Sequence, residues 1–305
     1  ASMNGYTSAI VALLEGGLKT TRAAAPPVAV FADPLVLAEA PIELTRAGLG
    51  DLISKPFCGC DWKIASLVRH EYHCRAPDRL LSVPFAQALD IFPRLAYREP
   101  EAITELFRLL LVSGLSMAIS GTSSPASGAE HLLSHYWDMV RLRDGELLNL
   151  HGAQVGVASM VVDELYREIF EYEFEDASFI QGPGVESARR DVEDHFGTLA
   201  PAVWSQWEAK LAARTEMDLG RLREQESVIK EEIERTLAVG RQVRVVLMAA
   251  GAATRAEQIG VSPTELVGAI RQGRKIRDRY TALDVAAELG ILEEFADRFL
   301  TKGAG

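Results

Sequence analysis

Three histidines have the spacing of metal ligands. His131 and His135 lie four residues apart in the segment SGAEHLLSHYW, so a helix would place both side chains on one face. His151 begins the next expected helix, beside a glycine that would let its ring point into a cleft. Two imidazoles and one carboxylate make an open metal site that leaves positions for water and substrate. On spacing alone, however, packing or surface positions explain such histidines more often than metal binding does.

Asp51 is the candidate carboxylate for this site. It follows two glycines in the apolar stretch RAGLGDLISK, and we expect it at the start of a helix. There it could bind a metal, or it could serve only as a capping residue, because the helix dipole favours negative charge at that end. The residues alone favour capping. Lys55 and Lys63 follow closely and could add positive charge.

A second cluster offers zinc-ligand residue types at a less favourable spacing. It consists of Cys58, Cys60, His70, His73 and Cys74. The spacing matches no usual zinc finger or knuckle, and cysteines are common buried residues of helices. The cluster is therefore the weaker candidate. The sequence contains no P-loop, no G-x-S-x-G and no G-x-G-x-x-G.

The predicted secondary structure that positions these residues changes from strands to helices near residue 34. Before it, residues 10–14 and 18–21 predict a hairpin, and residues 28–32 (VAVFA) predict one buried strand. After it, the hydrophobic period is helical, and Ser124 with Pro125 predicts the start of a helix. The fold is therefore predicted to be mainly α, with helices at residues 35–47, 49–69, 84–91, 98–120, 126–143, 151–172, 186–194, 201–212, 215–238, 241–251, 262–273 and 282–299.

Composition narrows the classes of protein. The 305 residues are 48% hydrophobic and 25% charged, which is typical of a globular chain. A net charge of −11 without a basic stripe argues against nucleic-acid binding. Three cysteines cannot all pair within the chain, which favours a reducing, cytoplasmic location. The most apolar run, residues 109–119, is about half the length of a membrane span, so we expect none.

Five segments carry a resemblance to a known family. They are ASMNGYTSA, AGLGDLISK with the following DWKIA, GTSSPASGAEHLLSHYW, LHGAQVGVAS and IRDRYTALDVAAELGIL. In this order they resemble the sn-glycerol-1-phosphate dehydrogenases, which belong with glycerol dehydrogenase, iron-type alcohol dehydrogenases and dehydroquinate synthase. The resemblance implies that residues 1–34 are a remnant of an α/β nucleotide-binding domain. Residues 35–305 would then form the helical, metal-binding catalytic domain of the dehydroquinate synthase-like fold.

The resemblance also implies roles for individual residues. Asp51, His131 and His151 would hold one divalent metal, with zinc as the default and nickel or iron compatible with the same ligands. His135 would be a catalytic residue beside them. Asn4 stands where the family usually has an Asp that approaches the substrate. The expected cofactor residues for NAD or NADP are Ser2, Thr7 and Ser8, and the expected substrate residues are Asn4, Ser123, Ser124 and Ser127. The segment from Ser123 to Gly128 would offer hydroxyls and free backbone N–H groups to a phosphate.

The implied reaction interconverts sn-glycerol 1-phosphate and dihydroxyacetone phosphate by hydride transfer, a step of phospholipid biosynthesis. The metal would polarise the substrate oxygen. A related polyol dehydrogenase, a dehydroquinate synthase-like enzyme and a non-catalytic helical remnant are the alternatives. A homo-oligomer is left open. Because the family's glycine-rich pyrophosphate loop would lie upstream of this sequence, we expect the chain alone to bind metal, to bind NAD(H) weakly and to lack activity.

Overall fold

The fold is mainly α, as predicted. The computed structural model describes residues 2–15, 18–177, 184–214 and 216–302. The strands and α-helices are β1 (Ile10–Glu15), β2 (Leu18–Ala23), α1 (Pro34–Glu39), α2 (Ile42–Leu52), α3 (Lys55–Val68), α4 (Ala76–Ala88), α5 (Pro100–Ser120), α6 (Ala129–Asp144), α7 (His151–Glu171), α8 (Val185–Phe196), α9 (Ala200–Ala213), α10 (Glu216–Glu224), α11 (Glu226–Ala249), α12 (Pro263–Gln272), α13 (Ala282–Glu288) and α14 (Leu292–Lys302). Short 3-10 turns lie at Phe92–Tyr97, Ser124–Ala126, Phe174–Asp176, Gly197–Leu199, Ala256–Ile259 and Gly273–Lys275.

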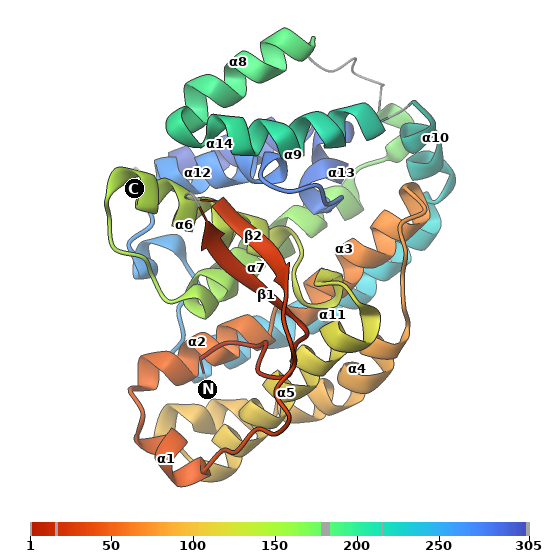
Figure 1. Cartoon of the computed structure of the whole chain (residues 1–305). Coiled ribbons are helices and arrows are strands. Elements are labelled where there is room, and N and C mark those ends of the chain that lie inside the picture. Colours follow the sequence, from red (N-terminus) through yellow and green to blue (C-terminus); the bar gives the residue numbers. More distant parts are fainter. Residues whose placement is uncertain (1, 16–17, 178–183, 215, 303–305) are drawn as a thin grey trace.

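The predicted hairpin is present. β1 pairs antiparallel with β2, with Ile10 opposite Ala23, and the hairpin crosses in front of the helices (Figure 1). Two cations fix it to the helical body. The Lys19 ammonium lies 2.7 Å from a carboxylate oxygen of Asp138 on α6, and the Arg277 guanidinium donates to Thr21 Oγ1 at 2.5 Å and to the Lys19 carbonyl at 3.1 Å. A two-stranded hairpin is marginal by itself in water, so these contacts hold it in place.

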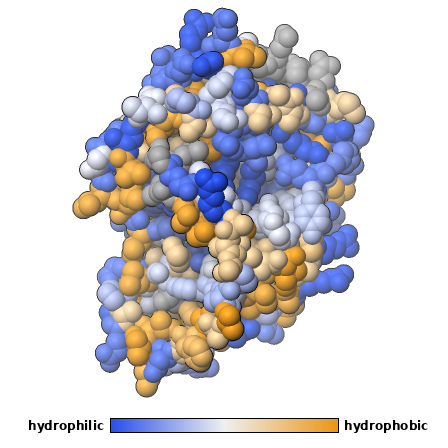
Figure 2. Space-filling model, in the orientation of Figure 1, coloured by the Kyte–Doolittle hydropathy of each residue, from blue (hydrophilic) through white to orange (hydrophobic). Residues whose placement is uncertain are grey.

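The strand predicted at residues 28–32 is not formed, which corrects that prediction. The segment makes no ladder with another strand, and the sheet of the described residues has two strands only. Val28 and Phe31 are 106% and 94% exposed. An apolar run becomes a strand only when a neighbouring strand accepts its hydrogen bonds, and no described strand pairs with this one. Exposed apolar side chains continue over α1, where Leu35 and Val36 are each 67% exposed. Figure 2 shows hydrophobic surface at the lower end of the molecule, where Figure 1 places α1.

Several predicted helices begin and end elsewhere. The helix predicted at 35–47 is split at Pro41, and the one predicted at 49–69 is two helices that meet at residues 53–54. The pair predicted at 215–238 and 241–251 instead breaks at Gln225, and α11 continues through Gly240. Ser124 and Pro125 begin only a 3-10 turn, since the N-cap of α6 is Gly128.

α7 crosses α2 at very close range, and this crossing sets the geometry of the site. A Cβ atom on Gly152 would collide with the carbonyl of Ala47, and one on Gly50 would collide with the carbonyl of Gly152. A Cβ on Gly156 would lie 3.0 Å from the Cα of Gly50. Glycine is therefore required at this crossing, because the two backbones touch directly.

Among the described helices, α5 alone has the length and composition of a membrane-crossing helix. It has 21 residues, and its most apolar window has a mean hydropathy of 1.7. Half of that window is buried inside the protein, where α5 packs against α1, α2 and α4. A buried core helix has the same composition, so this is weak evidence for a membrane span.

Candidate metal centre

Asp51, His131 and His151 converge from three different helices. One ligand-type atom of each residue lies within 4.8 Å of those of the other two. Asp51 is at the end of α2, His131 is in the first turn of α6, and His151 is the first residue of α7. Metal–ligand bonds of about 2 Å place donor atoms at most about 4 Å apart around one ion. The cluster therefore has nearly the spacing that a single divalent ion needs.

Asp51 lies in the last turn of α2, not at the start of a helix as expected. A carboxylate at a helix C-terminus faces the negative end of the dipole, so it needs other partners. Lys55 Nζ lies 3.3 Å from Asp51 Oδ1, and Asn4 donates to Oδ2 through its backbone N–H at 2.7 Å and to Oδ1 through its side-chain amide at 3.0 Å. Burial raises the pKa of Asp51, but Lys55 and His131 lower it further and leave that pKa well below its usual range. The carboxylate is ionised and ready for a cation.

His131 is oriented by the neighbouring carboxylate of Glu130. His131 Nδ1 lies 2.7 Å from Glu130 Oε1, while its Nε2 lies 3.6 Å from Asp51 Oδ1. Burial raises the pKa of Glu130, but the hydrogen bond and charge of His131 and the hydrogen bonds from Cys58 and Gly128 together outweigh it and leave that pKa at about 2. An ionised Glu130 accepts the proton on Nδ1, which leaves the Nε2 lone pair directed toward Asp51. Sequence reasoning missed Glu130 altogether.

His151 is oriented in the same way by a hydroxyl. Ser134 Oγ donates to Gln154 Oε1 at 2.8 Å, so it accepts from His151 Nδ1 at 3.1 Å, and Nε2 keeps a free lone pair. Burial and the nearby His131 lower the pKa of His151 to about 3. The imidazole is therefore neutral near pH 7, which is the form that binds a metal.

His135 lies beside the three ligand-type residues without being one of them. Its ring stacks on that of His151 with centroids 5.7 Å apart and lies 6.0 Å from that of His131. Burial, followed by the charge of Lys19, lowers the pKa of His135 well below its usual value. Its Nδ1 is buried and has no hydrogen-bond partner among the described residues. The predicted common face of His131 and His135 is confirmed.

A second set of ligand types shares His131. Cys58, Glu130 and His131 also gather within 4.8 Å. Burial raises the pKa of the Cys58 thiol well above its usual value, and the thiol donates to Glu130 Oε1 at 2.9 Å. In this set, Cys58 donates to Glu130, and Glu130 in turn orients the ring of His131. Of the cysteine and histidine cluster considered from the sequence, Cys58 alone belongs to a metal-type set among the described residues.

The expected cofactor residues lie at the N-terminus, where most of their polar groups have partners within the chain. Thr7 Oγ1 donates to the carbonyl of Leu111 at 2.6 Å, and Ser8 Oγ accepts from the N–H of Ile10 at 3.0 Å. The N–H of Ser2 donates to the hydroxyl of Tyr6 at 3.3 Å. None of these three is in the hydrogen-bond set around Asp51, whereas Asn4 is.

The segment from Ser123 to Gly128 differs from expectation in one respect. The N–H of Gly128, expected to be free, donates to Glu130 Oε1 at 2.8 Å, and the N–H of the following Ala129 donates to Asp61 Oδ2 at 2.6 Å. The segment instead has a cation beside it, which the sequence reasoning missed. Arg279 donates to Ser123 Oγ at 2.7 Å and also contacts the carbonyl of Ser127.

Comparisons with known proteins agree with the resemblance seen in the sequence. No protein-family model matches the chain. The glycerol-1-phosphate dehydrogenase (NAD(P)+) of Geobacillus stearothermophilus is 30% identical over 96% of the chain, and that of Bacillus velezensis is 30% identical over 94%. That of Halalkalibacterium halodurans is 37% identical over 54% of the chain. The chain is a homologue of these dehydrogenases. It spans 65%, 62% and 42% of their respective lengths.

The structure places three basic residues whose position sequence reasoning left open. Lys55 is four residues after Asp51, a spacing that can bring two side chains together, and the structure pairs them across the junction of α2 and α3. Arg277 and Arg279 belong to the segment IRDRYTALD, which had been noted for its resemblance only. The charge of Arg277 is among the causes that lower the pKa of His135, so it lies near the histidine cluster.

Proposed function

We propose that this chain is part of a metal-dependent, NAD(P)-linked oxidoreductase that interconverts sn-glycerol 1-phosphate and dihydroxyacetone phosphate in the cytoplasm. The observation that carries the proposal is the convergence of Asp51, His131 and His151 in a homologue of glycerol-1-phosphate dehydrogenases. The chain spans 65% of the first of these relatives, so the activity is proposed for the protein that contains it.

The donor set fits a divalent ion, with zinc as the default choice. Asp51 would supply the negative charge, and His131 and His151 would each supply an Nε2 lone pair. When bound, such an ion supplies Lewis-acid polarisation of the substrate oxygen. Glu130 and Ser134 keep the two imidazoles in the required tautomer. His135, with its unpartnered Nδ1, is proposed to contact the substrate next to the ligands.

The remaining site residues are proposed on the same basis. Ser2, Thr7 and Ser8 would form the floor under the nicotinamide of NAD or NADP, and hydride transfer needs the reacting carbons within about 3–3.5 Å. Thr7 and Ser8 would act mainly through the backbone, since their hydroxyls have partners within the chain. The substrate would contact Asn4 and the serines Ser123, Ser124 and Ser127, with Arg279 adding positive charge.

The substrate claim is tested with the full-length protein that contains this chain. Reduction of dihydroxyacetone phosphate and of dihydroxyacetone is compared with NADH and with NADPH, and oxidation of glycerol 1-phosphate is compared with that of glycerol. We expect the phosphorylated substrates to be turned over much faster. Equal rates with and without the phosphate would contradict the proposed substrate. Activity that persists after all divalent metal has been removed would contradict the proposed metal dependence.

The role of His135 is tested separately from metal binding. In the full-length protein, His135→Ala should lower turnover while metal content per chain stays near that of the wild type. The matched control is His195→Ala, because His195 hydrogen-bonds Tyr136 on α6 and is not among the ligand-type residues. A parallel loss of metal and activity in His135→Ala would instead make His135 a ligand.

A further inference from the structure

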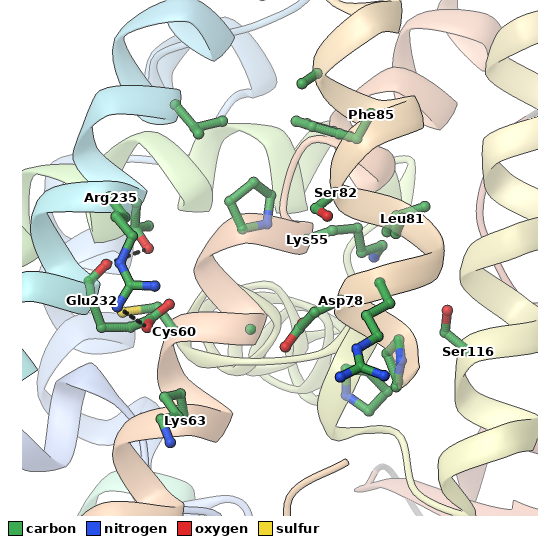
Figure 3. Close-up of a pocket in the computed structure, with 18 of the residues that line it drawn as sticks. Lys55, Cys60, Lys63, Asp78, Leu81, Ser82, Phe85, Ser116, Glu232 and Arg235 are labelled. Atoms are coloured by element: carbon green, nitrogen blue, oxygen red, sulfur yellow. Dashed lines mark hydrogen bonds and ion pairs between the residues drawn. The ribbon is translucent and has the colours of Figure 1, made fainter. Parts of the chain in front are cut away.

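A cavity of about 720 Å³ lies outside the cluster of ligand-type residues. Residues of α3, α4 and α11 form its walls, and Figure 3 shows Lys63 on α3, Asp78 and Ser82 on α4, and Arg235 on α11 around it. Cavities of about 300–1,000 Å³ are the usual size for small-molecule sites. Neither the proposed reaction nor the comparisons assign a role to this one.

The charge of the cavity is opposite to that of the whole chain. Five lysines and arginines line it against two carboxylates, although the chain has a net charge of −11. The cations are Lys55, Lys63, Arg75, Arg79 and Arg235, and the carboxylates are Asp78 and Glu232. A concave surface with one sign of charge concentrates ions of the opposite sign. The cavity therefore attracts anions although the chain as a whole is negatively charged.

Three of the five cations have no competing partner. Lys55 is paired with Asp51 at 3.3 Å, and Arg235 is paired with Glu232 at 3.1 Å. In contrast, the side chains of Lys63, Arg75 and Arg79 make no ion pair or hydrogen bond with any described residue. His73 Nε2 is buried and lacks a hydrogen-bond partner in the described part of the chain, and it lies 3.9 Å from Asp78 Oδ2.

Part of the cavity wall is apolar. Leu81, Phe85 and Leu89 of α4 and its continuation line it, and all three are buried. α4 also begins at the cavity, with Pro77 in the wall, so the positive end of the helix dipole adds to the field of the cations. A ligand that fits both parts of this wall carries an anionic group and a carbon skeleton.

We propose that this cavity binds a small organic phosphate. Lys63, Arg75 and Arg79 contact the phosphate, for which Arg and Lys are the usual donors. Leu81 and Phe85 contact the carbon part. Lys55 belongs both to the wall of the cavity and to the set around Asp51, so the two sites are neighbours. The proposal needs neither metal nor nicotinamide cofactor and is independent of the proposed reaction.

The test measures binding to the purified chain by calorimetry in the presence of EDTA, so that no metal can hold the anion. The probes are inorganic phosphate, sn-glycerol 1-phosphate and adenosine 5′-monophosphate, and the tightest of the three identifies the source of the phosphate. The variant Lys63→Gln/Arg79→Gln should weaken binding of the tightest probe by about tenfold or more. Circular dichroism and thermal melting establish that the variant is folded.

The control variant is Arg189→Gln/Arg190→Gln, which removes the same charge from α8, far from α4 in Figure 1. It should bind the probes as tightly as the wild type does. Absence of binding by all three probes overturns the proposal. An equal loss in both variants also overturns it, because attraction would then follow net charge only, and so does unchanged binding by the Lys63→Gln/Arg79→Gln variant.

Discussion

At the scale of single residues, the Asp51 carboxylate depends on two donors of different kinds. Lys55 contributes a charge, and Asn4 contributes two neutral N–H donors. The resembled family usually has an Asp at the position of Asn4. An Asp there would keep the backbone donor but would place a second carboxylate where an amide now donates at 3.0 Å. The Asn therefore stabilises Asp51 before any ion binds.

We expect Asn4→Asp to destabilise the metal-free chain by about 1–3 kcal/mol, because a partly buried donor to Asp51 is replaced by a like charge. A divalent ion should offset this repulsion, so addition of zinc should raise the melting temperature more in Asn4→Asp than in the wild type. Asn149→Asp is the control, since Asn149 donates to the carbonyl of Ile259 at 2.8 Å. An identical zinc shift in wild type and Asn4→Asp would contradict the prediction.

Glu130 acts through His131. Glu130→Gln replaces the charged acceptor of the His131 Nδ1 proton by a neutral amide oxygen, so Nε2 is held toward Asp51 less firmly. Groups that orient a metal-ligating histidine typically contribute about 10–100-fold in metal affinity. We expect Glu130→Gln to weaken zinc binding by about that factor, as measured by competition with a chelator. Cys58→Ala, which removes only another donor to Glu130, should bind zinc nearly as the wild type does.

At the scale of elements, the glycines between α2 and α7 decide how closely Asp51 approaches His151. Gly152→Ala places a methyl group against the carbonyl of Ala47, so the two helices must separate or the backbone must distort. We expect a loss of unfolding free energy of about 3 kcal/mol and a loss of zinc affinity of about tenfold or more. Gly220→Ala is the control, because its Cβ would meet no atom within 4 Å. Zinc affinity unchanged in Gly152→Ala would show that the crossing does not set the site.

At the scale of the whole molecule, Asp61 on α3 connects helices that are far apart in sequence. Its carboxylate accepts from the Tyr166 hydroxyl at 2.6 Å, from the N–H of Ala129 at 2.6 Å and from the N–H of Ala282 at 2.7 Å. It thereby links α7, α6 and α13 to α3. Burial and the charge of Glu130 nevertheless raise the pKa of Asp61 to about 7.

This raised pKa predicts how stability depends on pH. Between pH 4 and 7 the folded chain keeps a proton on Asp61 that the unfolded chain has released, so this contribution to stability is lost as pH rises through about 7. From pH 5 to 8 the loss is about 3 kcal/mol. When the metal-free Asp61→Asn variant is unfolded in urea at different pH values, its unfolding free energy should not show this pH-dependent loss, whatever its absolute stability. The control is Asp194→Asn, because Asp194 is exposed on α8; its unfolding free energy should depend on pH as that of the wild type does. The same pH dependence in Asp61→Asn would refute the assignment to Asp61.

The sequence by itself determined the features that depend on neighbours along the chain. The helical period after residue 34, the common face of His131 and His135, the position of His151 at the start of α7 and the hairpin are all local, and the structure contains each of them. The relation of Asp51, His131 and His151 came from motif resemblance, since spacing could not choose between ligand and packing histidines. Helix ends were less accurate, because Pro41 and Gln225 break helices where the hydrophobic period continues.

Only the tertiary structure decided which distant groups meet. Asn4 reaches Asp51 across 47 positions, and the Cys58 thiol of α3 reaches the Glu130 carboxylate of α6 across 72 positions. The run at residues 28–32 has the composition of a strand, yet it stays unpaired because a strand needs a neighbour that its own residues cannot supply. The cationic cavity likewise exists only where α3, α4 and α11 meet. Long-range contacts like these are set by packing and charge, and no local pattern encodes them.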